Sequence, residues 1–396
     1  MRVLMLSWEY PPLVVGGLGR HVEALARELS ASGHDVCVVT RGQSAARVDE
    51  VRDGVRIVRA AIDPLAIDFT TESLLSWSQA AEHAMLRAAL PLVRRWRPDV
   101  VHAHDWLVAQ TAITLTELTK APLVATLHAT EAGRHQGWLP RPLNGAIHSV
   151  ERWLAQRADE VITCSGTMRD EAAALFDLAP DRLTVIPNAI DAARWQASAP
   201  DTTATRDRHA GTGPLLVFAG RLAHEKGVQT LLAAVGRLRA AQPGLRLVVA
   251  GTGPHAETLR AQARALRIAR RVDWLGFVPE ERLPSVLGAA DIVVVPSLYE
   301  PFGIVALEAV VAGAPLVVSE TGGLRDLATG GVATAAFPAG DAGALATAIE
   351  KLLADPLAAQ RAVARAARIV GRDYSWPAVA ARTVEIYERA AGRSVR

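Results

Sequence analysis

The sequence predicts two α/β domains, each a doubly wound parallel sheet with helices on both faces. Short aliphatic runs alternate with longer amphipathic stretches along the 396 residues. The aliphatic runs are continuous, which is typical of parallel strands that are buried on both faces. The alternation stops between residues 189 and 213, where Ser, Pro, Asp, Thr and Gly recur, and then starts again. A chain of this length also suits two domains.

The first half of the chain contains seven predicted strands, each a short run rich in Val, Ile or Leu. They cover residues 3–6, 36–39, 55–58, 99–102, 123–127, 160–163 and 184–186. Helical patterns occupy three of the intervals, at residues 18–32, 72–96 and 144–157. We therefore expect a first domain over residues 1–188 and a linker over residues 189–213.

The second half contains five further predicted strands. They cover residues 215–219, 245–250, 272–274, 292–295 and 316–318. Helices are expected at residues 228–239 and 255–266, from residue 303, and through the tail from residue 342. This pattern predicts a second domain over residues 214–375. Doubly wound sheets bind ligands at the carboxyl ends of their strands, so functional residues are expected in the loops there.

Composition excludes several classes of protein. Lys plus Arg number 43 against 41 for Asp plus Glu, a formal charge of +2, so no basic field for nucleic acid is expected. The sequence has no run of about 18 apolar residues, which argues against a membrane span. Cys37 and Cys164 lie in strand-like runs without CxxC spacing, which indicates a reducing compartment. The apolar run after Arg2 ends at Ser7, too early for a secretory signal, so we expect a cytoplasmic protein.

The first loop carries Gly16 and Gly17 directly before a predicted helix. Glycines at this place let backbone N–H groups approach an anion, which the helix dipole also favours. The spacing is not GxGxxG, so a dinucleotide fingerprint is absent. A tight strand–helix turn without a ligand explains the glycines equally well.

Two cations follow the predicted strand at residues 215–219. Arg221 and Lys226 lie in the loop before the next helix. An arginine fork and a lysine point charge at the carboxyl end of a strand suit a diphosphate. The alternative is an ordinary solvated loop.

A pair of glutamates flanks the start of the helix that is predicted from residue 303. Glu300 lies in the loop before this helix, and Glu308 lies inside it among Val, Ala and Leu residues. A carboxylate in apolar surroundings needs a partner, because burying a lone charge is costly. Sugar hydroxyls are one kind of partner, and an arginine in an ion pair is another.

Histidines mark two strand ends in the first half. His102 ends one predicted strand, with His104 and Asp105 just after it, and His128 follows the end of the next. His102 and His104 suit a metal by residue type, but no third ligand accompanies them at convincing spacing, so we expect no metal. His128 and Asp105 lie on the edge where a ligand is expected, whereas a lone histidine is more often a structural hydrogen-bonding group.

Together these motifs resemble the retaining glycosyltransferases of family 4, which have the GT-B fold of two Rossmann-like domains facing across a cleft. The shared motifs follow the family's order along nearly the whole chain: Gly16-Gly17-Leu18-Gly19, His104-Asp105-Trp106, His128, Ile186-Pro187-Asn188, Gly220-Arg221, Lys226-Gly227, Glu300 with Glu308, and Gly322-Gly323-Leu324. Residues 7–12 and 127–135 are most similar to actinobacterial α-(1→4)-glucosyltransferases of the glycogen-synthase type, including those linked to methylglucose lipopolysaccharide.

The resemblance implies how each matching residue would contact the nucleotide-sugar donor. Arg221 and Lys226 would bind the donor diphosphate. Glu300 would contact the donor sugar, and Glu308 the nucleotide ribose. His128 would contact the sugar near the reacting carbon. The remaining residues implied at the site are Asp105 beside His128, Gly16 and Gly17 in the first loop, Gly303, Ile304 and Val305 over the phosphates, and Gly276, Phe277 and Val278 beside the base.

The implied activity is transfer of glucose from UDP- or ADP-glucose to an α-(1→4)-glucan or related oligosaccharide, with retention and without a metal or other cofactor. Val14 stands where the starch-type bacterial synthases carry a lysine, so the sequence does not select ADP-glucose. A nucleotide-sugar 2-epimerase of the same fold, or transfer of another sugar such as mannose, are alternatives. The paired glutamates and the two cations argue against a non-catalytic binding module. The family also implies that a final helix, residues 376–396, returns to brace the first domain.

Overall fold

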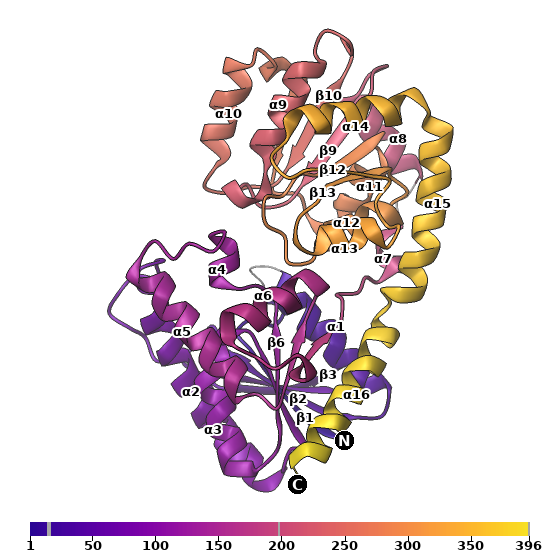
Figure 1. The fold of residues 1–396 in the computed structure, drawn as a ribbon. Helices are drawn as coiled ribbons and strands as arrows, with labels where there is room; N and C mark the ends of the chain where they lie inside the picture. The colour runs from indigo at the N-terminus through magenta and orange to yellow at the C-terminus, as the bar shows by residue number, and fades with distance from the viewer. Residues whose placement is uncertain (14–16, 197–198, 395–396) are drawn as a thin grey trace. The chain divides into compact units, whose positions relative to one another are not determined.

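The computed structural model describes residues 1–13, 17–196 and 199–394. The chain divides into two units, one made of Met1–Asn188 with Trp376–Arg396 and the other of Ala189–Ser375 (Figure 1). Each unit has its own largely parallel sheet with helices packed against it. The fold class predicted from the sequence, two Rossmann-like α/β domains, is confirmed. None of the helices built from the described residues is both long and apolar enough to cross a bilayer.

The first unit contains an eight-stranded sheet in the order β3-β4-β2-β1-β5-β6-β7-β8. Its strands are β1 (Arg2–Ser7), β2 (Asp35–Arg41), β3 (Val48–Arg52), β4 (Val55–Ala60), β5 (Val100–His104), β6 (Leu123–Leu127), β7 (Glu160–Thr163) and β8 (Leu183–Val185). β3 was not predicted. It pairs antiparallel with β4 at the sheet edge, and its residues are mostly exposed, so no apolar run marks it.

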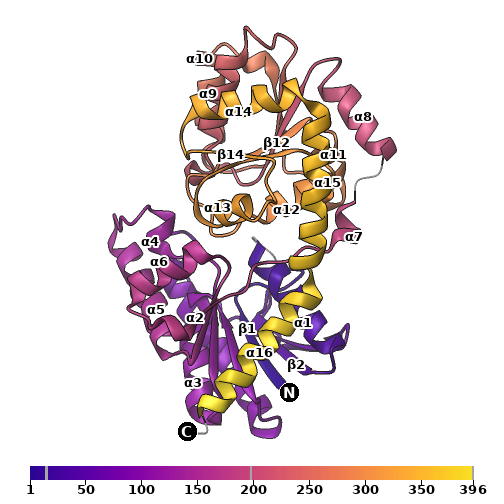
Figure 2. The ribbon, with the colours of Figure 1, turned by 45° about the vertical axis from the view of Figure 1, so that its right-hand side comes forward.

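The helices of the first unit include one that comes from the end of the chain. They are α1 (Gly17–Ala31), α2 (Leu74–Arg95), α3 (Ala109–Thr119), α4 (Glu131–Arg134), α5 (Pro142–Arg157), α6 (Gly166–Phe176) and α16 (Trp376–Ser394). Figure 2 shows α16, in yellow, beside α1. Tyr387 of α16 is fully buried, and Arg389 pairs with Glu160 of β7 through a 2.6 Å contact. These contacts attach the last helix to the first sheet.

The second unit contains a six-stranded parallel sheet in the order β11-β10-β9-β12-β13-β14. Its strands are β9 (Leu215–Ala219), β10 (Arg246–Ala250), β11 (Val272–Gly276), β12 (Ile292–Val295), β13 (Leu316–Ser319) and β14 (Ala335–Phe337). Its helices are α7 (Ala192–Trp195), α8 (Ala199–His209), α9 (Val228–Leu238), α10 (Ala256–Ala265), α11 (Leu283–Gly288), α12 (Ile304–Val311), α13 (Gly322–Thr329), α14 (Ala342–Ala354) and α15 (Pro356–Asp373).

The segment that the sequence predicts as a linker is partly helical. Residues 189–213 contain α7 and α8 and belong to the second unit. α8 has no apolar stripe, so periodicity does not reveal it. Its Arg206 donates to the Ala289 carbonyl at 3.0 Å and contacts Asp291 at 3.0 Å. Polar contacts therefore hold α8 in place, and for this reason the hydrophobic pattern of the sequence does not reveal the helix.

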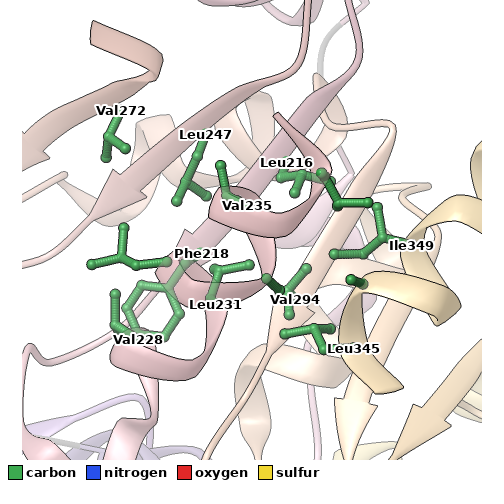
Figure 3. Packing of buried hydrophobic residues seen from close by; sticks show 14 of the residues in the cluster. Leu216, Phe218, Val228, Leu231, Val235, Leu247, Val272, Val294, Leu345 and Ile349 are labelled. Atoms are coloured by element: carbon green, nitrogen blue, oxygen red, sulfur yellow. The ribbon is translucent and has the colours of Figure 1, made fainter. Parts of the chain in front are cut away.

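The core of the second unit is an apolar layer between its sheet and the helices α9 and α14 (Figure 3). Val228, Leu231 and Val235 share one face of α9, at the spacing of an amphipathic helix. They pack with residues that are at most 2% exposed: Leu216, Phe218, Leu247, Val294, Leu345 and Ile349. Burying one such side chain contributes roughly 1.5–3 kcal/mol. This packing holds β9 and β12 in place. Their carboxyl ends lead into the loops that carry residues predicted to bind the nucleotide-sugar donor.

Candidate active site

The carboxyl ends of β5 and β6 carry the first group of predicted residues. The two strands are neighbours, and their register pairs His104 with Thr126. His104 ends β5, Asp105 follows it, and His128 comes directly after β6. Asp105 Oδ1 accepts a 2.7 Å hydrogen bond from the backbone N–H of His128. The structure therefore brings Asp105 and His128 together at the predicted edge.

Asp105 has a strained backbone, with φ 61° and ψ 173°. This region is nearly restricted to glycine and costs other residues about 1–3 kcal/mol. Hydrogen bonds hold the residue there: its own N–H donates to the Thr126 carbonyl at 2.9 Å, and its carboxyl group accepts from the backbone of His128 and Ala129. Burial raises the pKa of Asp105 to about 6, although the two N–H donors act in the opposite direction.

Three imidazoles meet at this edge. His104 Nδ1 and His128 Nε2 lie 3.2 Å apart in a hydrogen bond, and the ring of His21 in α1 lies edge-on to His128 with centroids 4.7 Å apart. Burial lowers the pKa of His128 to about 4 and holds the pKa values of His21 and His104 well below their usual range. All three are therefore neutral near pH 7. His21 was not predicted from the sequence, and its place beside Val22 on the buried face of a helix was the available signal.

The structure changes one expectation about these histidines. The sequence offered no third histidine at convincing spacing, but the structure places His21 beside the other two, with one nitrogen each of His21, His104 and His128 within 4.8 Å of one another. His102 is not part of this group. Its Nδ1 lies 2.7 Å from the Tyr387 hydroxyl and its Nε2 lies 2.7 Å from Thr126 Oγ1. Both of its nitrogens are thus used in structural hydrogen bonds, as expected for a buried histidine.

The loop that follows His128 is held by a buried carboxyl group. Thr130 caps α4 by accepting from the Gly133 N–H at 2.9 Å. The Glu131 N–H donates to Glu151 Oε1 at 2.8 Å, and Asn144 donates to the Glu131 side chain at 2.5 Å. Burial raises the pKa of Glu151 to about 8. Sequence reasoning missed Glu151, since nothing in the pattern of α5 marks a carboxyl group that supports a distant loop.

The second group of residues lies at the carboxyl ends of β9 and β12. Lys226 Nζ lies 2.7 Å from Glu300 Oε2, and Ser297 Oγ lies 3.0 Å from the same oxygen. Gly227, next to Lys226, has φ +69°, and a Cβ there would lie 1.8 Å from the Pro296 carbonyl oxygen. Only glycine permits this approach of the two loops. The close approach brings together Lys226 and Glu300, both of which were predicted from the sequence. It also adds Ser297, which was not predicted.

The backbone around Glu300 is equally tight. Its carbonyl accepts from the Gly323 N–H at 2.9 Å, and a Cβ on Gly322 would lie 2.0 Å from the same oxygen. Gly303 is the N-cap of α12, which runs from Ile304 to Val311. The first N–H groups of this helix, including those of Ile304 and Val305, lie at its positive end. Glu308, inside α12, is 8% exposed.

The other predicted residues make contacts different from those of Lys226, Glu300 and Ser297. Arg221 pairs with Glu225 of the same loop, and its side chain is 59% exposed. Gly276 ends the edge strand β11, where Phe277 is 76% exposed and Val278 follows. Gly17 is the first residue of α1. Gly16 lies outside the described residues.

Comparison with known proteins identifies related chains across both units. Residues 15–194 match the model for glycosyltransferase family 4, and residues 202–369 match the model for glycosyl transferases group 1. A glycogen synthase of Mycobacterium tuberculosis is 45% identical over 98% of this chain and 94% of that protein. An alpha-maltose-1-phosphate synthase of Mycolicibacterium smegmatis is 31% identical over 98% of this chain and 99% of that protein.

The solved structures agree on the fold. Sucrose-phosphate synthase from Thermosynechococcus elongatus superposes with a TM-score of 0.83 at 24% identity, covering 99% of each chain. The catalytic domain of starch synthase IV from Arabidopsis thaliana, bound to ADP and acarbose, superposes with a TM-score of 0.77 at 20% identity, covering 99% of each chain. With relatives of 31–45% identity that span nearly the whole sequence, the chain is a glycosyltransferase and belongs to family 4 of the GT-B glycosyltransferases.

Proposed function

We propose that this enzyme transfers glucose from a nucleotide-glucose to an α-(1→4)-glucan or related oligosaccharide, with retention at the anomeric carbon. The observation that carries the proposal is the 45% identity to a glycogen synthase over 98% of the chain. The bonded group of Lys226, Glu300 and Ser297 supports it, because charged and hydroxyl groups at one strand edge suit a sugar diphosphate.

The chemical problem is the charge of a departing nucleoside diphosphate. Lys226 supplies a cation, and the N–H groups at the start of α12 supply a positive helix end. Arg221 adds a planar fork that suits phosphate oxygens. These groups stabilise charge as it develops, which lowers the barrier more than uniform binding would.

The remaining residues act on the sugar and the nucleoside. His128 is a neutral imidazole, so it hydrogen-bonds to sugar hydroxyls near the reacting carbon without adding charge. Asp105 holds the backbone of His128. Glu300 accepts hydrogen bonds from the donor sugar, and Glu308 accepts them from the ribose. The backbone at Gly276, Phe277 and Val278 borders the base, and the donor-binding role that the family implies for Gly16 and Gly17 completes the proposal.

A donor and acceptor panel tests this proposal. The enzyme is incubated with UDP-glucose, ADP-glucose or GDP-mannose, each with maltooligosaccharides or with glucose 1-phosphate. We expect free nucleoside diphosphate and a longer glucan to appear together from a glucose donor. Glucose 1-phosphate is included because one relative is an alpha-maltose-1-phosphate synthase. Exclusive transfer of mannose, or epimerisation without any acceptor, would contradict the proposal.

We also propose that the transfer needs no metal or other cofactor. The sequence has no Asp-x-Asp motif of the kind that would hold a divalent ion beside the diphosphate. Activity should therefore survive EDTA, and loss on chelation with recovery on adding Mg²⁺ or Mn²⁺ would contradict this mechanism. A cytoplasmic site of action fits the two buried cysteines, Cys37 and Cys164, neither of which forms a disulfide.

A further inference from the structure

The group of His21, His104 and His128 has the composition of a transition-metal site. The three side chains come from α1, from the end of β5 and from the residue after β6. One nitrogen of each lies within 4.8 Å of the others. The structure thus gathers three imidazoles from separate segments at one edge of a parallel sheet.

The spacing within this group suits a small cation. Zinc binds imidazole nitrogen at about 2.0–2.1 Å, so two ligands on a tetrahedral ion lie about 3.3 Å apart. His104 Nδ1 and His128 Nε2 are already 3.2 Å apart. His21 lies within reach of both with a modest movement of its ring, because its centroid is 4.7 Å from that of His128 and 5.6 Å from that of His104.

A second observation points to a missing partner. His21 is 7% exposed, and its Nδ1 is buried without a hydrogen-bond partner among the described residues. A buried polar nitrogen that lacks a partner costs about 1–3 kcal/mol. The His21 side chain has a hydrogen bond with Asn188, so coordination of a cation through Nδ1 would remove the cost at its unpartnered nitrogen.

The type of ligand atom decides which cation suits this group. Imidazole suits Zn²⁺, Co²⁺ and Ni²⁺, whereas Mg²⁺ and Ca²⁺ prefer oxygen ligands.

We propose that His21, His104 and His128 form a binding site for a zinc-like divalent cation, and that occupancy of this site inhibits the enzyme. Three histidines leave one coordination position for water. Inhibition follows because the metal takes the His128 imidazole away from the donor sugar. The inhibition rests on the proposed function of His128, whereas binding of the metal does not.

The binding test uses the full chain without an affinity tag, so that no added histidines bind metal. Zn²⁺ affinity is measured by competition with a chromophoric chelator, and Co²⁺ is added separately to record visible absorption. We expect one equivalent bound and the intense absorption of tetrahedral Co²⁺. His21→Gln should weaken Zn²⁺ binding by at least about ten-fold, since even the loss of an indirect partner costs a metal site that much.

Two control variants separate this site from other histidines. His255→Asn alters the His224–His255 pair in the second unit, whose ring centroids are 5.5 Å apart. His83→Asn alters an exposed histidine on α2. Both should bind Zn²⁺ as the unchanged protein does. Thermal unfolding with and without Zn²⁺ checks that His21→Gln is folded, and Zn²⁺ should raise the Tm of the unchanged protein but not of this variant.

The outcomes decide between the site and a plain network of hydrogen-bonded histidines. Zn²⁺ binding that is absent, or that is unaffected in folded His21→Gln, would overturn the proposal. Inhibition should appear over the Zn²⁺ concentrations at which the site fills and should reverse with EDTA. Inhibition that is equally strong in His21→Gln would overturn the inhibitory role. Zinc binding is measured without sugar, so a lack of transfer from every donor would count against the proposed function alone.

Discussion

Lys226 and Glu300 form an ion pair within the second unit, with Nζ and Oε2 2.7 Å apart and side chains that are 25% and 11% exposed. The pair connects the loop before α9 to the loop before α12. Partial burial strengthens such a pair, because less water screens the charges. The glutamate therefore keeps the ammonium group at the strand edge where the donor diphosphate is expected.

Replacing Lys226 should reduce turnover more than donor affinity. In its proposed role Lys226 is a cation whose interaction grows as the diphosphate leaves, so for Lys226→Ala we expect kcat to fall by about 100- to 1000-fold with a smaller change in KM. Lys351→Ala, an exposed lysine on α14, is the matched control and should leave both constants unchanged. Steady-state kinetics measures both. A rise in KM alone for Lys226→Ala would contradict a transition-state role.

Replacing Glu308 should act mainly on donor affinity. A ribose contact is much the same before and during the reaction, so Glu308→Ala should raise the donor KM with little change in kcat. Some loss of stability is expected as well, since Glu308 is 8% exposed within α12. Kinetics and thermal unfolding on the same preparation separate the two effects. Lost turnover in a folded Glu308→Ala protein would show that its assigned role is wrong.

Two substitutions of Asp105 should differ in their effects. Asp105→Ala leaves the N–H groups of His128 and Ala129 without their acceptor and keeps the strained backbone, so the free energy of unfolding should fall by about 1–3 kcal/mol. Turnover should fall too, because His128 loses its support. Asp105→Asn keeps an amide oxygen as acceptor and should be close to the unchanged protein in stability. Equal destabilisation by both variants would argue against the hydrogen-bond explanation.

Gly227 should tolerate no side chain. Gly227→Ala places a methyl group 1.8 Å from the Pro296 carbonyl oxygen at φ +69°, so we expect a loss of about 3 kcal/mol in the free energy of unfolding. Gly371→Ala, in α15, is the control, because its Cβ would meet nothing within 4 Å. That change should stabilise the helix by about 0.5–1 kcal/mol. Chemical denaturation followed by circular dichroism measures both, and similar stabilities would disprove the close approach.

Glu151 should make the first unit less stable in alkaline solution. Burial raises its pKa from 4.5 to about 8, so the folded protein holds the proton more tightly than the unfolded chain does. The stability this gives is fully present below pH 4.5 and is lost as the pH rises through about 8.

Glu151→Gln removes this titration and keeps an acceptor for the Glu131 N–H. At pH 9 the variant should be more stable than the unchanged protein by up to about 4–5 kcal/mol, the size that about 1.4 kcal/mol per pKa unit gives, and its Tm should vary less between pH 6 and pH 9. Glu72→Gln, with a side chain that is 77% exposed, is the control. A parallel decline in Tm for Glu151→Gln and the unchanged protein would contradict this account.

The sequence by itself determined most of the helices and strands and the two-domain α/β class. Buried parallel strands such as β5, β6, β9 and β12 are continuous apolar runs, so a local pattern reveals them. It also determined which residues lie at strand ends, including His128 and Glu300. Two of the edge strands were not predicted, because β3 is exposed and β14 (Ala-Ala-Phe) is short and bears little apolar pattern.

Only the tertiary structure decided which of those residues meet. Lys226 bonds Glu300 because β9 and β12 are adjacent and Gly227 lets their loops touch. His21 joins His104 and His128 because α1 packs beside the strand ends. Residues far apart in the chain come into contact through strand order and packing, which no local period encodes. The fold class was therefore readable from periodicity, whereas the histidine group required the structure.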